Sequence, residues 1–368
     1  HARYPDFAEI NRAFYPHGRA PRPGELFRCP GQAETLAAIA ETRGEAFYRG
    51  PLARAIAECA AAEGGLMTAE DLAAHQADWV EPLAVEYHGV HLHEIPPNGQ
   101  GVAALIALGI LRHLDLRRFA ADSAESLHLQ IEAMKRAFAE VFRTVADVDC
   151  MTLAPARLLD DGRLSAAAAE IDMERSGELG RRLPPGGGTV YLTAADASGM
   201  MVSFIQSNYM GFGSGVVVPG TGIALQNRGL GFTLESGHPN QVRGGKRPFH
   251  TIIPGFVTRQ GQPLMSFGVM GAHMQPQGHV QMMVRVFDHG QNPQAACDAP
   301  RWHVSPDGSV QLEPGFPAET VAGLTRRGHR VSIGAPTALF GGGQLIHRLE
   351  DGYAAASDWR KDGQAVGF

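Results

Sequence analysis

Apolar residues recur at helical spacing through much of the first half of the chain. Residues 30–47 and 50–65 each carry such a face and each meets a glycine towards its end, which predicts two helices. Thr68 and Asp71 have the spacing of a helix-capping box and predict a short helix after them. The clearest amphipathic pattern runs over residues 123–147 and predicts a long helix.

A different pattern separates these helical segments. Residues 82–95 alternate between apolar and polar and contain a glycine, which predicts two short strands. The turn-forming segment PPNGQG over residues 96–101 follows, and an apolar helix should then run to about Leu114. The first half is therefore expected to be mostly helical with one strand pair.

The second half is dominated by strand patterns. Residues 174–188 are polar and then rich in proline and glycine, which predicts an exposed linker where chain cleavage is tolerated. After it, residues 189–207 predict two strands joined by a turn at 196–199. Further strands are predicted over 247–258, 263–271, 344–349 and 353–357, and a helix over 276–290. A helix-rich half followed by a sheet-rich half predicts an α+β fold.

Composition narrows the classes of partner. The 368 residues carry a net charge of −6 without a basic block, which argues against nucleic acid and favours a small molecule. The longest apolar run, residues 101–111, is too short to cross a bilayer, so no membrane partner is expected. The cysteines form no CxxC pair, which argues against a disulfide framework and favours the cytoplasm over the periplasm; they are Cys29, Cys59, Cys150 and Cys297.

Thr189 is the candidate nucleophile. It follows three glycines and opens a predicted strand, and Gly188 on the acyl side can adopt strained backbone angles at low cost. Attack of the Thr189 hydroxyl on the Gly188 carbonyl would give an ester, and its hydrolysis would free a threonine amine with a pKa of about 7.7–8.0. One residue would then supply nucleophile and base. From these four residues alone, a linker ending at a β-branched residue is the simpler interpretation.

The motifs around Thr189 change that interpretation. GGGTVYLTAADASG, GFGSGVVVPGTGI, GGKRPFHTIIPG and ASDWRKDGQAVGF follow one another in this order, after an opening GRAPRPGELFRCPGQAETLAAIAE. In their order and spacing they resemble the γ-glutamyltranspeptidase family of N-terminal-nucleophile hydrolases. The resemblance implies a four-layer αββα sandwich and self-cleavage into a large-subunit portion, residues 1–188, and a small subunit, residues 189–368. It also implies a heterodimer of the two products and leaves open a dimer of such heterodimers.

The resemblance assigns roles to individual residues. Thr189 matches the nucleophile, and Ser207 stands where the family has a threonine that hydrogen-bonds it; a serine hydroxyl can do the same. Gly271 and Ala272 match the pair whose N–H groups form the oxyanion hole, and Tyr209 falls among the substrate-binding positions. If position 272 needs a positive φ, its alanine will be strained.

Three departures from the family pattern concern substrate binding. The family's acidic anchor for a substrate α-amino group is replaced by Gly231, and a Gln or Glu position has become Arg228, which should repel an ammonium and attract a carboxylate. The serine pair for the substrate carboxylate is His250-Thr251, in which His250 would bind an anion only when protonated. The loop 233–247 is short, and its Glu235 could replace the amine anchor, although a loop carboxylate most simply faces water.

These departures favour an amide with a carboxylate and no α-amine, such as oxamate. The alternatives are a γ-glutamyl hydrolase or transferase acting on glutathione-like substrates, and an inactive family member retained as a scaffold. The mechanism requires no metal or organic cofactor, and the histidines at 88, 91 and 93 are interpreted as ordinary surface or core residues. The resemblance also implies a segment before His1 with a carboxylate-binding arginine, for which these residues offer no counterpart.

Overall fold

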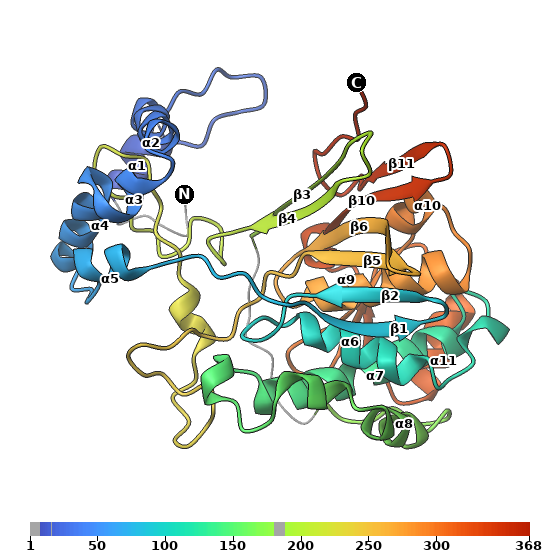
Figure 1. Ribbon diagram of the computed structural model, residues 1–368. Helices are drawn as coiled ribbons and strands as arrows, with labels where there is room; N and C mark the ends of the chain where they lie inside the picture. Colours follow the sequence, from blue (N-terminus) through green and yellow to red (C-terminus); the bar gives the residue numbers. More distant parts are fainter. Residues whose placement is uncertain (1–7, 16, 180–187) are drawn as a thin grey trace. The chain divides into compact units, whose positions relative to one another are not determined.

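The computed structural model describes residues 8–15, 17–179 and 188–368, and it contains two compact units (Figure 1). The first comprises residues 1–79 and 210–227, and the second comprises residues 80–209 and 228–368. These units follow contact density, whereas the expected division at residues 188 and 189 concerns a covalent cut. The subunit boundary therefore stays a prediction.

The first unit is helical. Its helices are α1 (Ala8–Phe14), α2 (Pro30–Glu41), α3 (Glu45–Arg49), α4 (Pro51–Ala62) and α5 (Ala69–Ala74). The capping box predicted at Thr68 and Asp71 is confirmed, since each side chain bonds the other residue's backbone N–H. The single helix predicted over residues 30–47 is wrong in detail, because Gly44 adopts φ 93° and separates α2 from α3. Residues 210–227 of the same unit pack against these helices; for example, Thr35 Oγ1 donates to the Thr221 carbonyl at 2.9 Å.

The second unit is built on a six-stranded antiparallel sheet in the order β1-β2-β5-β6-β10-β11. The strands are β1 (Leu83–Tyr87), β2 (Val90–Glu94), β5 (Gly255–Arg259), β6 (Gln262–Met270), β10 (Gly342–Leu349) and β11 (Gly352–Ser357). The strand predicted over 247–258 begins only at Gly255, after Pro254. Proline has no N–H to give to a strand ladder, which accounts for the later start.

Helices and a hairpin cover opposite faces of this sheet. Along β6, Val269 packs against Gly278 in α9 (Met274–Met283), whereas the preceding residue, Gly268, lies against the ring of Tyr191. Successive residues of a strand point to opposite faces. The hairpin of β3 (Val190–Ala195) and β4 (Met201–Gln206) therefore crosses the face that α9 leaves uncovered, and it contacts β6 and β10 (Figure 1).

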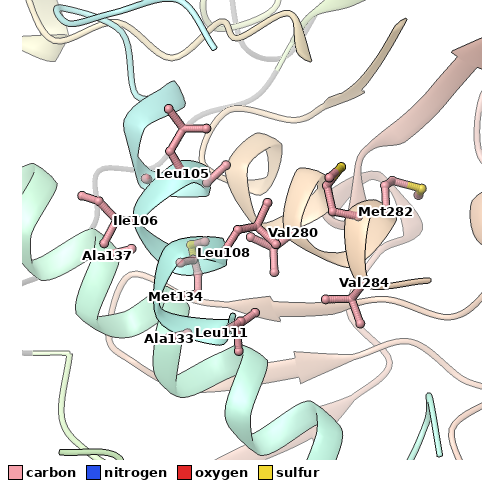
Figure 2. Close-up of a cluster of buried hydrophobic side chains, with 14 of the residues drawn as sticks. Leu105, Ile106, Leu108, Leu111, Ala133, Met134, Ala137, Val280, Met282 and Val284 are labelled. Atoms are coloured by element: carbon pink, nitrogen blue, oxygen red, sulfur yellow. The ribbon is translucent and has the colours of Figure 1, made fainter. Parts of the chain in front are cut away.

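The main core lies between the sheet and its helices. Helix α6 (Gly101–Leu111) is apolar on all sides and buried at every residue, as expected for a helix surrounded by protein. Figure 2 shows Leu105 and Leu108 of α6 close to Met134 of α7 (Ala124–Thr144) and to Val280 of α9. This packing helps to hold α9, which begins shortly after the predicted oxyanion turn.

The remaining elements complete the second unit. They are α8 (Asp161–Ala169), a π-helical turn (Val284–Asp288) that continues α9, α10 (Pro293–Asp298), α11 (Ala318–Arg326), and a small sheet of β7 (Trp302–Val304), β8 (Val310–Leu312) and β9 (Val331–Ile333). Across the described ranges, no helix combines the length and apolar character that a membrane span requires. All four cysteines carry free thiols.

Candidate active site

Thr189 lies at the open end of the β3–β4 hairpin, opposite its turn. It is half-buried, directly precedes β3 and follows Gly188, whose φ is 146°. Val190 pairs with Gln206 in the hairpin, so extending the antiparallel register by one residue places Thr189 opposite Ser207. The two candidate catalytic hydroxyls therefore share one end of the hairpin. The linker residues 180–187 that precede this junction lie outside the described residues.

A cavity of about 420 Å³ opens beside Thr189. Met270, the last residue of β6, lines it together with Gln344 of β10 and the C-terminal residues 361–366. The predicted oxyanion turn follows Met270 directly, so Thr189 and this turn lie at the same end of the sheet. Residues 361–366 belong to the motif ASDWRKDGQAVGF, but the resemblance assigned them no role, so their position beside Thr189 was not expected.

The turn at Gly271 and Ala272 connects β6 to α9. Gly271 has φ 119° and Ala272 has φ 50°, so the positive φ considered for position 272 is present. A left-handed backbone at a non-glycine residue costs of order 1–3 kcal/mol and persists where the surroundings over-determine it. Ala272 is buried, and Gln275 N–H donates to its carbonyl at 3.2 Å. The strain marks a turn that is held rather than relaxed.

Arg228 is buried and links several of the predicted site residues. It is 8% exposed; its Nη2 donates to Ser207 Oγ at 2.7 Å and its Nη1 donates to Thr251 Oγ1 at 3.2 Å. Its guanidinium also lies over the ring of Tyr209, 5.7 Å from the ring centroid. Burial lowers the pKa of Arg228 to about 10, so the side chain remains cationic at neutral pH. The arginine therefore contacts three of the predicted site residues, Ser207, Thr251 and Tyr209.

His250 differs from its expected role. Burial, and to a smaller degree the positive charge of Arg228, lowers the pKa of His250 to about 3. Its Nδ1 accepts a hydrogen bond from Ile252 N–H at 3.4 Å, which a ring protonated at that atom could not do. His250 is therefore neutral at neutral pH, and the condition under which it would bind an anion is not met there. The cation near Thr251 is Arg228.

Gly231 leaves no room for the acidic anchor that the family pattern would place there. A Cβ at this position would lie 2.4 Å from the carbonyl oxygen of Phe249, well inside van der Waals contact. Asn240 Nδ2 donates to the Gly231 carbonyl at 2.6 Å, which holds the segment against residue 249. Glu235 is exposed, as expected of a solvated loop carboxylate. The backbone of Phe249 therefore occupies the space that a side chain at position 231 would need.

Gln100 is a site residue that the sequence did not single out. Its side chain is fully buried and donates to the carbonyls of Thr251 and Ala272, at 2.5 and 2.8 Å. The only signal in the sequence is a glutamine between two glycines at the end of the PPNGQG turn, before an apolar helix. A turn interpretation accounts for that composition, so the contact with the oxyanion turn could not be inferred.

One buried cluster of potential metal ligands lies elsewhere in the second unit. In the part of the chain that the structure describes, His128, Glu132 and His329 bring ligand atoms within 4.8 Å of one another. Lys135 Nζ already lies 2.9 Å from Glu132 Oε1 and 3.4 Å from His329 Nδ1. His329 can then donate from Nε2 to His128 Nδ1 at 2.8 Å, and His128 from Nε2 to the Asp172 carbonyl. The Lys135 ammonium therefore already contacts two of the three potential ligands, Glu132 and His329.

Comparisons with known proteins bear on the family of this chain. A profile of the family described as Gamma-glutamyltranspeptidase matches residues 2–368. The chain is 36% identical to the glutathione hydrolase-like YwrD proenzyme of Bacillus subtilis over 96% of its residues and 69% of the relative's. It is also 36% identical to the oxamate amidohydrolase proenzyme of Klebsiella pneumoniae, over 95% of its residues and 67% of the relative's.

A solved structure bears on the fold. The cephalosporin acylase from Bacillus halodurans is 47% identical and superposes with a TM-score of 0.92, over 98% of this chain and 67% of that one. The expected α+β fold of the N-terminal-nucleophile type is confirmed. Its relatives are named as amide-bond hydrolases and proenzymes, and the chain, an amidohydrolase, belongs to the γ-glutamyltranspeptidase family.

Proposed function

We propose that this amidohydrolase is an autoprocessing N-terminal threonine enzyme acting on a small amide that carries a carboxylate and no α-ammonium, such as oxamate. The observation that carries the substrate class is the buried, cationic Arg228 beside Ser207 and Thr251, combined with the closed backbone at Gly231. The name of one relative, oxamate amidohydrolase, supports the same class.

The first step would create the nucleophile. The Thr189 hydroxyl attacks the Gly188 carbonyl, the peptide bond is replaced by an ester, and the Thr189 nitrogen becomes a free amine. Water then hydrolyses the ester and leaves two subunits, one that contains residues 1–188 and one that begins at Thr189. Gly188 lacks a Cβ, and its φ of 146° is a conformation that other residues rarely adopt. The junction is thus suited to a distorted scissile bond.

Turnover would use the same atoms. The Thr189 amine takes the hydroxyl proton as the oxygen attacks the amide carbonyl, and the N–H groups of Gly271 and Ala272 stabilise the oxyanion. Collapse of the tetrahedral intermediate expels the amine, ammonia in the case of oxamate, which takes the proton. Water attacks the acyl-threonine ester and releases the acid. Ser207 Oγ accepts from Arg228 and from Tyr209 N–H, so its own hydrogen can be donated towards Thr189.

The substrate carboxylate would be held by the guanidinium of Arg228 and the hydroxyl of Thr251. A hydrogen bond from the charged guanidinium to a carboxylate is about twice as strong as one between neutral groups. The same cation would repel the ammonium of a γ-glutamyl group, whose usual acidic partner has no space at Gly231. Both effects act in the same direction on specificity.

The discriminating experiment compares two amides on one preparation. Purified protein is incubated with oxamate, with ammonia release measured, and separately with γ-glutamyl-p-nitroanilide, with nitroaniline release measured. We expect turnover of the first and little of the second. Rapid nitroaniline release would contradict the substrate class and support the γ-glutamyl alternative. One uncut band on a denaturing gel, with neither activity, would support the inactive scaffold.

A further inference from the structure

Gln100 connects two segments that the proposed mechanism uses separately. Its Nε2 donates to the carbonyl of Thr251 at 2.5 Å and to that of Ala272 at 2.8 Å. Its backbone N–H donates to the His250 carbonyl at 2.9 Å. Residue 251 precedes β5 and residue 272 follows β6, so a single side chain from the start of α6 holds both.

The hydrogen bonds fix how this side chain is oriented. The carbonyls of Thr251 and Ala272 can only accept, so the amide nitrogen must face them. Gln100 Oε1 then accepts from His273 Nδ1 at 3.0 Å, which places the ring hydrogen on that nitrogen. Each polar atom of the Gln100 side chain has a partner, in a fully buried position.

His273 is suited to remain a neutral donor. The rings of Phe138, Phe142 and Phe249 surround it, with centroids 5.3 to 6.3 Å from its own. Its Nε2 is buried and has no hydrogen-bond partner among the described residues. This burial lowers the pKa of His273 to about 3. The donor of Gln100 Oε1 therefore keeps the same protonation state across the pH range in which the free Thr189 amine would act.

We propose that Gln100 is a positioning residue, which sets the spacing between the carboxylate-binding segment at Thr251 and the oxyanion turn at Ala272. The inference rests on the proposed function for the roles of these two residues. Ala272 holds a strained φ of 50°, and its carbonyl is fixed by the Gln100 amide. Loss of that bond would let the turn relax, and the Ala272 N–H would no longer point at the reacting oxygen.

Gln100→Glu tests this role because it keeps the shape and removes both amide donors. A misplacement of about 1 Å at a reacting group can cost about 100-fold in rate. We expect kcat for the accepted amide to fall by about that factor near pH 8. The deficit relative to the parent should shrink towards pH 6, because the buried carboxyl, once protonated, regains one donor. A residue with a merely structural role would not produce this pH-dependent recovery.

Gln130→Glu is the matched control. Gln130 is also a buried amide, with Nε2 donating to Ser126 Oγ and Oε1 accepting from Trp302 Nε1, and neither partner is a proposed site residue. It should lose stability to a similar degree and keep the parent's kcat within a few-fold. Hydrogen exchange gives a readout that needs no turnover. Peptides covering 250–253 and 271–275 should exchange faster in the Gln100 variant than in the control.

The two proposals fail in different ways. An unchanged kcat in Gln100→Glu, an equal loss in Gln130→Glu, or unchanged exchange at both segments would overturn the role of Gln100. If the parent protein hydrolyses neither amide, the substrate class fails, and the exchange of residues 250–253 and 271–275 still decides whether Gln100 holds them.

Discussion

Arg228 Nη2 donates to Ser207 Oγ at 2.7 Å, and its Nη1 reaches Thr251 Oγ1 at 3.2 Å. One buried cation therefore joins the hydroxyl proposed to assist the nucleophile to the hydroxyl proposed to hold the substrate. Changes at this residue should affect substrate binding and the organisation of the site together.

Arg228→Met should lower kcat/KM for oxamate by about 10- to 150-fold, because a hydrogen bond to a charged group contributes about 1.5–3 kcal/mol. Arg228→Lys should retain part of the activity, since an ammonium supplies the charge without the planar fork. Steady-state kinetics measures both. Arg157→Met, at a side chain that is 66% exposed, is the control and should change nothing. Equal losses at both arginines would contradict the assignment.

Gly231→Asp should not create γ-glutamyl hydrolysis. The introduced Cβ would lie 2.4 Å from the Phe249 carbonyl, so the backbone must shift before any carboxylate can reach the site. We expect a lower thermal unfolding midpoint and no nitroaniline release from γ-glutamyl-p-nitroanilide. Gly229→Asp tests the same loop at a position where a Cβ meets nothing within 4 Å. A folded Gly231→Asp protein that acquires γ-glutamyl hydrolase activity would show that space is not the barrier.

Ala272→Gly should preserve activity, because any residue supplies the backbone N–H and glycine adopts φ 50° without strain. Relief of strain, about 1 kcal/mol or more, is offset by the greater freedom of glycine in the unfolded chain, about 0.4–1 kcal/mol. Stability should therefore change little. Ala272→Val should lose both stability and turnover, since a β-branched residue is a genuine outlier at this φ. Thermal unfolding and initial rates measure the pair, and a fully active valine variant would argue against a tightly held turn.

Lowering the pH should destabilise the protein already at pH values well above those at which carboxylates usually titrate. Burial lowers the pKa of His250, His273 and His329 to about 3 and that of His303 to about 4, against about 6.5 in an unfolded chain. Between these values the unfolded state binds the protons and the folded state does not, so stability is present above about pH 6.5 and is lost as the pH falls. Glu94, whose pKa burial raises, opposes this by at most one proton. The thermal midpoint should fall steadily from pH 7 to pH 5; a flat profile would contradict the neutral, buried histidines.

Local sequence patterns anticipated much of the fold. The strand pair at residues 82–95, the long helix after Ser123 and the hairpin after Thr189 are confirmed, because each has a regular period and a clear cap or turn. Helix α8 and the strands β7 to β9 were not anticipated. A strand of three residues is too short to show an alternating pattern. Gly44 broke one predicted helix through a positive φ that its neighbours do not reveal.

The sequence offers candidate site residues where chemistry is carried by residue type, and none where it depends on contacts. Thr189, Ser207 and the turn at Gly271 are candidates that come from motifs in order along the chain. The neutral state of His250 depends on burial, and the role proposed for Gln100 depends on two carbonyls more than 150 residues away in sequence. Neither property leaves a trace in local composition.

The most direct test of the account is the covalent state of the purified protein and of its Thr189→Ala variant. Intact mass spectrometry and N-terminal sequencing should find the parent as two chains, one of which begins Thr-Val-Tyr-Leu. The variant should remain a single chain that hydrolyses no amide. An uncut parent that turns over substrate, or an alanine variant that is cleaved at the same bond and active, would contradict the central claim that Thr189 becomes a chain end and serves as the nucleophile.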